Sequence, residues 1–241
     1  MNITDSAVRL PDDANAVDLW LRRAEECHIG HSIVAPTDPY VTVFNSDGNR
    51  QMANLMKKHP QAFSGLAVAN PWYGSAAVDT LRFAFDEGLI GLYVHPMRQG
   101  FRLTEPILNP LVEMCARYSK PVYIPVGTPV CSMPFQLAEL ARHFPTVQFV
   151  MGHGAYPDFW YDVVPALAQT PNVFVETSCQ VGAIIQAVID NLWPERVIFG
   201  SGYPRSEPMV EIKKMNRLTL NDETRAKVMC TNARDLWGLE A

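Results

Sequence analysis

Residues 171–204, PNVFVETSCQVGAIIQAVIDNLWPERVIFGSGYP, contain the pattern that decides the fold. Two short runs rich in Val, Ile and Phe, Val173–Thr177 and Val197–Gly200, flank an apolar stretch at Ala183–Asn191. Buried parallel strands have this composition, and the stretch between them has the length of a helix. The spacing is that of one strand–helix–strand unit with parallel strands.

The same unit recurs along most of the chain. The other predicted strands are Ser32–Ala35, Gly65–Ala69, Gly91–His95, Pro121–Ile124 and Val147–Met151. The other predicted helices are Ala14–Cys27, Gly48–Lys58, Ser75–Glu87, Ile107–Ser119, Phe135–His143 and Phe159–Gln169. Helix-ending residues support several of these boundaries: Gly88 follows Glu87, and Pro60 follows His59.

Seven strands are clear, and Asn2–Leu10 is a candidate for an irregular first strand. Eight such units predict an α/β fold of the compact (β/α)8 TIM-barrel class. A doubly wound open sheet is the alternative, but no GxGxxG follows the first strand and no phosphate-binding loop motif occurs. No linker or charge run marks a boundary, so we expect a single domain over residues 1–241.

Composition narrows the class of protein further. The 241 residues include 20 Lys and Arg against 25 Asp and Glu, a formal net charge of −5, which disfavours nucleic acid or an anionic membrane as a partner. Five scattered cysteines without a CxxC pair indicate a reducing compartment. With no apparent signal sequence and no apolar run near 20 residues, we expect a cytoplasmic protein. A homodimer stays open as its oligomeric state.

Four segments in order along the chain point to a family. They are Gly91–Pro96 (GLYVHP), Phe149–Ala155 (FVMGHGA), Pro171–Ser178 (PNVFVETS) and Arg196–Pro204 (RVIFGSGYP). Together they resemble the strand ends of the amidohydrolase-related family of TIM-barrel metal-dependent hydrolases and decarboxylases. The resemblance extends from about Ala53 to Leu236 and implies the same barrel.

The resemblance also implies a metal site, and this chain departs from it. The family's ligands are His-x-His or Glu-x-His on the first strand, a histidine on the fifth and an aspartate on the eighth. Here no His-x-His occurs, Pro125 stands at the strand-five position, and Gly202 replaces the strand-eight aspartate. Only the strand-six residue, His153, remains. Because catalytic zinc needs about three protein ligands, we expect no metal, and we expect no other cofactor.

Losing the metal restricts the chemistry. A bound metal lowers the pKa of water from about 15.7 to about 7, which corresponds to about 12 kcal/mol of nucleophile generation. One general acid or base supplies only ~10²- to 10⁴-fold. We therefore expect a reaction with a lower barrier: decarboxylation, another lyase reaction, an isomerisation or cyclisation, or the opening of a lactone.

Active sites of these barrels form at the carboxyl ends of the strands. There, His153 is the predicted general acid/base, and Glu176 either orients it or acts as a second base; a structural ion pair is equally open. Arg98 and Arg205 suit a substrate carboxylate, because guanidinium forks match that group. The other predicted substrate contacts are residues of strand ends and the loops that follow: His95, Cys131, Trp160, Cys179 and Tyr203.

These residues predict a metal-independent, amidohydrolase-like enzyme acting on a small cyclic or aromatic carboxylic acid. One alternative is a pseudoenzyme, a ligand-binding or partner-subunit barrel without catalysis. A second alternative is a metal-dependent hydrolase whose missing ligands come from a partner chain. An open pocket with His153 at its floor favours the enzyme, whereas a mouth filled by Pro125, Met151 and Tyr203 favours the pseudoenzyme.

Overall fold

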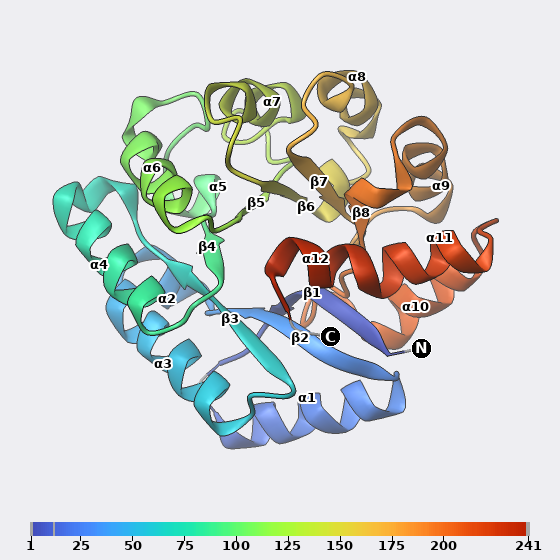
Figure 1. The fold of residues 1–241 in the computed structure, drawn as a ribbon, viewed down its shortest axis with the longest axis horizontal. Helices are drawn as coiled ribbons and strands as arrows, with labels where there is room; N and C mark the ends of the chain where they lie inside the picture. The colour runs from blue at the N-terminus through green and yellow to red at the C-terminus, as the bar shows by residue number, and fades with distance from the viewer. Residues whose placement is uncertain (1, 12, 240–241) are drawn as a thin grey trace.

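Eight parallel strands form a barrel surrounded by helices in the computed structural model, which describes residues 2–11 and 13–239 (Figure 1). The strands follow one another around the barrel in chain order. They are β1 (Ile3–Arg9), β2 (Ile29–Ala35), β3 (Phe63–Val68), β4 (Gly91–Tyr93), β5 (Val122–Pro125), β6 (Phe149–Gly152), β7 (Val173–Glu176) and β8 (Val197–Ile198). The fold is a (β/α)8 TIM barrel, as the sequence predicts.

The first and last strands meet and close the barrel. Ser6 N–H donates to the Phe199 carbonyl at 3.0 Å, and Arg9 N–H donates to the Tyr203 carbonyl at 2.9 Å. The register of β1 against β2 shifts between Asp5 and Val8, so the first strand is irregular. This irregular strand ends with Arg9 at the barrel mouth.

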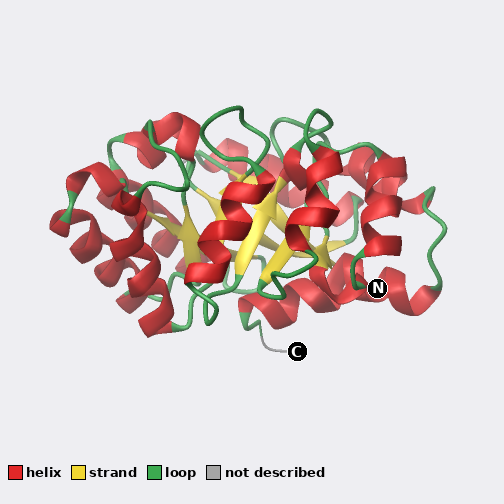
Figure 2. Ribbon diagram, turned by 90° about the horizontal axis from the view of Figure 1, so that it is seen from above, coloured by secondary structure: helices red, strands yellow, loops and turns green. Residues whose placement is uncertain are grey.

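The helices lie outside the strands, which Figure 2 shows enclosed within the molecule. They are α1 (Ala14–Glu26), α2 (Asp38–Thr42), α3 (Asn45–Lys58), α4 (Ser75–Asp86), α5 (Pro96–Gln99), α6 (Asn109–Tyr118), α7 (Pro134–His143), α8 (Val163–Leu167), α9 (Gly182–Asn191), α10 (Pro208–Asn216), α11 (Asp222–Ala226) and α12 (Asn232–Trp237). Short 3-10 turns precede several of them; η3 (His153–Ala155) carries the site described below.

Two apolar layers hold the barrel together. The larger layer fills the space between strands and helices, and its Leu, Val, Ile and Phe side chains are almost fully buried. The smaller layer fills the barrel itself and includes Tyr93, Tyr123 and Trp237. Trp237 comes from α12 and donates from Nε1 to Ser6 Oγ at 3.3 Å, which closes the amino-terminal end of the barrel. The cavity described below lies toward the carboxyl ends.

The structure adds elements that the pattern does not predict. The short helices α2 and α5 follow β2 and β4, and both are too brief to show a helical period. The predicted helix at 159–169 is reduced to a 3-10 turn and α8. No helix in the described part of the chain has the length and apolar character needed to cross a membrane.

Candidate active site

A cavity of about 340 Å³ opens at the carboxyl ends of the strands. It lies within the size range of small-molecule sites, about 300–1,000 Å³. Its lining is Ser6, Ala7, Val8, Arg9, Ile33, Ala35, Leu66, Tyr93, His95, Arg98, Tyr123, His153, Tyr156, Gly202, Tyr203, Pro204 and Arg205. The lining combines apolar side chains with three arginines, two histidines and four tyrosines.

The turn after β6 holds His153 in an unusual backbone conformation. His153, Gly154, Ala155 and Tyr156 all have positive φ, at 63°, 51°, 65° and 51°. Each non-glycine residue in this region costs of order 1–3 kcal/mol, and such strain persists only where the surroundings impose it. One restraint is the neighbouring loop, because a Cβ on Gly127 would lie 2.1 Å from the Ala155 carbonyl oxygen. The strained turn directs the His153 side chain into the cavity.

A buried carboxylate organises the floor of the site. Glu176 at the end of β7 is fully buried, and four donors point at its two oxygens. They are the Tyr123 hydroxyl at 2.7 Å, the His153 N–H at 3.0 Å, and the Ser178 N–H and hydroxyl at 2.5 Å and 2.9 Å. This arrangement satisfies a carboxylate and leaves it no free face toward the cavity. Glu176 is therefore placed to position its neighbours.

Ser178 connects Glu176 to the imidazole of His153. The His153 Nδ1 lies 2.8 Å from Ser178 Oγ, closer than its 3.7 Å to the nearest Glu176 oxygen. Ser178 has a single hydroxyl proton, which it donates to the Glu176 carboxylate, because that group can only accept. His153 Nδ1 must then carry a proton and donate it to Ser178. The lone pair of His153 therefore lies on Nε2.

His153 is neutral in this environment. Burial, reinforced by the charges of Arg205 and Arg9, lowers the pKa of His153 to about 3. Its Nε2 has no hydrogen-bond partner among the described residues and keeps some accessible surface in the cavity. The arrangement offers a ligand one unprotonated ring nitrogen surrounded by cations.

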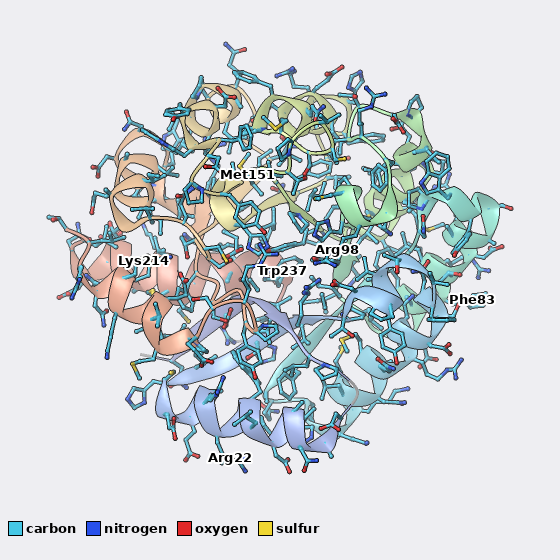
Figure 3. All side chains as sticks on the ribbon, turned by 180° about the vertical axis from the view of Figure 1, so that it is seen from behind. Arg22, Phe83, Arg98, Met151, Lys214 and Trp237 are labelled. Carbon is cyan, nitrogen blue, oxygen red and sulfur yellow. The ribbon has the colours of Figure 1, made fainter. Side chains whose placement is uncertain are left out.

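Two arginines share one carboxylate on the β1–β4 side of the cavity. Arg9 Nη1 lies 2.5 Å from one oxygen of Asp38, the first residue of α2, and Arg98 of α5 pairs with the other oxygen. A guanidinium has five N–H donors, so both side chains retain donors for a ligand. Viewed from the side opposite to Figure 1, Arg98 lies near the centre of the barrel (Figure 3).

A third arginine lies on the β8 side. Arg205 Nη1 donates to the Tyr156 hydroxyl at 2.5 Å, and its guanidinium carbon lies 5.3 Å from the centre of that ring. The Tyr156 ring in turn lies 4.8 Å from the His153 ring. Arg205 is thus held against the strained turn while its charge stays at the mouth of the cavity.

His95, at the end of β4, is a second neutral histidine. Burial and the charges of Arg98 and Arg9 lower the pKa of His95 to about 3. Its Nδ1 is buried with no partner among the described residues, although its backbone N–H donates to Gln99 at 2.8 Å. An unsatisfied polar atom on a cavity wall marks a place where a ligand group or a water can bind.

The structure brings most of the predicted site residues together. His95, Arg98, Tyr203 and Arg205 line the same cavity as His153, and Glu176 lies directly beneath it. The three other predicted contacts, Cys131, Trp160 and Cys179, do not belong to the lining.

Local packing explains these three positions. Trp160 lies against Tyr161, with ring centres 4.8 Å apart, rather than over the cavity. Cys179 has a positive φ of 59°, and burial raises the pKa of its thiol to about 11, which keeps it protonated. The Cys131 carbonyl accepts from Leu103 N–H at 3.0 Å, which ties its loop to the segment after α5.

Sequence reasoning missed four residues that shape the site: Arg9, Asp38, Tyr123 and Ser178. Arg9 had a visible signal, because it stands at the carboxyl end of the predicted strand 2–10. Ser178 lies in one of the family-like segments, next to Glu176. Asp38 and Tyr123 had no signal, since their partners are 29 to 60 residues away in the chain.

The cavity does not fit the metal that the resembled family would imply. On β1 the lining residues two apart are Ala7 and Arg9, β5 ends in Pro125, and Gly202 follows β8. A Cβ at Gly202 would lie 3.0 Å from Ser178 Cβ and Oγ, at a φ of +68°. Within residues 2–11 and 13–239, no three His, Cys, Asp or Glu side chains are grouped to hold a metal ion. The guanidinium of Arg9 brings a positive charge where ligands would need to be.

Solved structures with the same fold include two kinds of decarboxylase. The 2,6-dihydroxybenzoate decarboxylase from Rhizobium has a TM-score of 0.78 at 16% identity, and the match covers 100% of both chains. A 5-carboxyvanillate decarboxylase from Novosphingobium aromaticivorans, solved with bound manganese, has a TM-score of 0.78 at 17% identity over 99% of this chain and 97% of that one. The 5-carboxyvanillate decarboxylase from Sphingomonas paucimobilis has a TM-score of 0.79 at 15% identity over 99% of both chains.

These likenesses show the fold, and the sequence shows the family. No curated protein matches the chain in sequence. The model of the amidohydrolase family, however, matches residues 24–239, nearly the whole barrel. The four family-like segments and the barrel with its site at the carboxyl ends agree with that match. The chain belongs to the amidohydrolase family, as a divergent member whose described residues lack the metal ligands.

Proposed function

We propose that this protein is a metal-independent decarboxylase of a small cyclic or aromatic carboxylic acid, with His153 as the proton-transfer group. One observation carries the proposal: the accessible Nε2 of His153 faces a cavity lined by Arg9, Arg98 and Arg205. Three guanidiniums favour an acidic ligand. The Nε2 nitrogen of His153 has no hydrogen-bond partner among the described residues, so it is free to exchange a proton with that ligand.

Binding of the substrate carboxylate converts His153 into the general acid. Burial is the main cause of the low pKa of His153, and the charges of Arg205 and Arg9 add to it. A carboxylate bound beside the imidazole favours its charged form against both effects, so the imidazole gains a proton at Nε2 while Nδ1 keeps its own. In the reaction, the bond between the ring carbon and the carboxyl carbon breaks and its electron pair stays on the ring. The ring carbon takes the proton from His153 Nε2, and CO2 leaves. His153 returns to its neutral form.

The fixed charges of the cavity support such a step. Electron density accumulates on the ring as CO2 departs, and a preorganised cation stabilises charge more strongly in a buried site than in water. Arg9 is the most enclosed of the three arginines, with a side-chain exposure of 25%. We assign it the role of stabilising that charge. The decarboxylases of aromatic acids with the same fold support this choice of reaction.

The test combines binding with turnover. Purified protein treated with EDTA is incubated with a panel of hydroxybenzoates and related cyclic acids; binding is followed by thermal shift and CO2 release by a coupled assay. We expect at least one acid to stabilise the protein and release CO2 without added metal. His153→Ala should retain the binding and lose the turnover by about 10²- to 10⁴-fold.

Each other outcome has a definite meaning. Binding without turnover by the unaltered protein would replace the enzyme with a ligand-binding barrel. Turnover that EDTA removes and manganese or zinc restores would overturn the metal-independent chemistry. If no acid binds, the proposal fails altogether.

A further inference from the structure

We propose that the ligand of this cavity is a dianion, a ring that carries two acidic groups bound at opposite sides of the barrel mouth. The inference rests on the proposed function, since it concerns the same site, and it specifies the class of substrate. It follows from where the three arginines lie and from what already contacts each of them.

The first binding position is the Arg9–Arg98 pair. Asp38 contacts both guanidiniums through one oxygen each and so sets them side by side. One carboxylate shared by two guanidiniums leaves one positive charge and several N–H donors unmatched at this position. An acidic group of the ligand would supply the missing partner.

The second binding position is Arg205. Among the described residues its polar contact is the neutral hydroxyl of Tyr156, which leaves the full charge of the guanidinium without a carboxylate. The Tyr156 ring beneath it fixes its position at the mouth. Arg205 is exposed at the mouth and has no acidic partner among the described residues, so its guanidinium can pair with a second anionic group of a ligand.

Arg98 and Arg205 lie on opposite sides of the barrel, whereas Arg9 ends β1, which is hydrogen-bonded to the segment after β8. Arg98 follows β4 and Arg205 follows β8, and strands four apart in a closed barrel of eight face each other across its axis. His153 follows β6, midway between them around the barrel, so a ring that bridges the two positions passes its Nε2.

Two further carboxylates lie below the cavity without lining it. Glu176 receives four hydrogen bonds from Tyr123, His153 and Ser178. Asp5 accepts from the N–H groups of Ser201 and Ala7 at 2.8 Å and 3.1 Å. Glu176 and the Oδ1 of Asp5 accept from the barrel's own donors, and neither residue lines the cavity, so the acidic groups of a ligand remain the available partners for the arginines above.

Matched pairs of ligands test the inference. The three benzene dicarboxylates are each compared with their monomethyl ester, which keeps the shape and removes one charge, by calorimetry at pH 7 and fixed ionic strength. We expect at least one dicarboxylate to bind tenfold or more tightly than its ester. Arg205→Met should reduce that preference to within about twofold of equality, while the affinity for the ester changes little.

Two other variants distinguish binding at the two arginine positions from a general effect of the protein's positive charges. Arg98→Met should weaken the binding of both members of the pair. Arg117→Met, which removes an exposed charge on α6, should change neither affinity. If every dicarboxylate binds no better than its ester, the dianion is wrong although the carboxylate site stands. If neither dicarboxylates nor esters nor benzoate bind, the proposed function fails as well.

Discussion

Ser178 determines which nitrogen of His153 is available for chemistry. Its hydroxyl accepts from Nδ1 and donates to Glu176, which keeps a proton on Nδ1 and leaves the lone pair of the imidazole on Nε2. Glu176 acts on His153 through this hydroxyl and through the His153 backbone N–H. Both residues are positioning residues, since neither lines the cavity.

Replacing Ser178 by Ala should remove the preference of His153 for the tautomer that is protonated on Nδ1. Without the hydroxyl, Nδ1 loses its acceptor, and the form protonated on Nε2 becomes populated. We expect turnover to fall by about 10- to 100-fold, less than the full ~10²- to 10⁴-fold of an acid/base group. Nitrogen NMR of labelled histidine distinguishes the two tautomers of His153 directly. Ser178→Thr, which keeps the hydroxyl, should restore the tautomer protonated on Nδ1. An unchanged tautomer in Ser178→Ala would show that Ser178 does not position His153.

Ligand binding should also change the protonation of His153. An anion beside the imidazole favours its charged form, so the pKa of His153 should rise from about 3 when a carboxylate binds. At pH 5 the complex should therefore take up protons that the free protein does not hold. Calorimetry with benzoate in two buffers of different ionisation enthalpy measures the uptake. His153→Asn should reduce it and the exposed His143→Asn should not; equal uptake in all three proteins would contradict the assignment.

At the scale of elements, the turn after β6 depends on the loop after β5. Gly127 has a φ of +93°, and its missing side chain makes room for the Ala155 carbonyl of the turn that carries His153. The sequence shows two glycine-containing loops but not that they touch. The strained conformation of His153 is thus maintained by packing between loops of neighbouring strands.

Gly127→Ala should therefore damage both stability and the site. A positive φ costs a non-glycine residue about 1–2 kcal/mol, and a Cβ at 2.1 Å from a backbone oxygen forces the turn to move. Gly88→Ala is the matched control, because Gly88 has a similar φ of +96° with nothing within 4 Å of the added Cβ. Urea unfolding should show a clearly larger loss for Gly127→Ala, which alone should lose ligand binding. Equal losses in the two variants would mean that the turn tolerates displacement.

At the scale of the whole molecule, the neutral histidines make stability depend on pH. His95 and His153 have a pKa of about 3 when folded, against an ordinary value of 6.5. Between those values the unfolded chain binds protons that the folded chain does not, so the free energy of unfolding falls as pH falls from about 6.5 toward 3. Asp5 acts in the opposite sense, because burial raises its pKa to about 6 and the folded chain keeps its proton longer.

A comparison of variants isolates this effect. Each histidine contributes a slope of up to about 1.4 kcal/mol per pH unit in that window. Replacing both His95 and His153 by Asn should flatten the dependence of unfolding free energy on pH between 4 and 6, measured by urea denaturation. The exposed His143→Asn should retain the dependence of the unaltered protein. A double variant with an unchanged slope would show that these histidines are not held neutral.

The sequence by itself determined the strands, most of the long helices and the barrel they form. Short runs of Val, Ile and Phe repeat at the spacing of one strand–helix unit, and this signal is local. It also determined which residues stand at strand ends, because parallel strands in a barrel place all their carboxyl ends at one mouth. His95, His153, Arg98, Tyr203 and Arg205 are predicted to belong to the site on that ground together with the resemblance to the family, and all five line the cavity.

Only the tertiary structure decided how those residues act. The pairing of Arg9 and Arg98 with Asp38 depends on two helices too short to have a period. The bond from Tyr123 to Glu176 joins residues 53 positions apart. Cys131, Trp160 and Cys179 come from the correct end of the barrel but lie outside the cavity lining, because loop packing sets their direction. Strand order follows from local pattern and chain connectivity, whereas side-chain direction and hydrogen-bond partners depend on contacts between segments distant in the sequence.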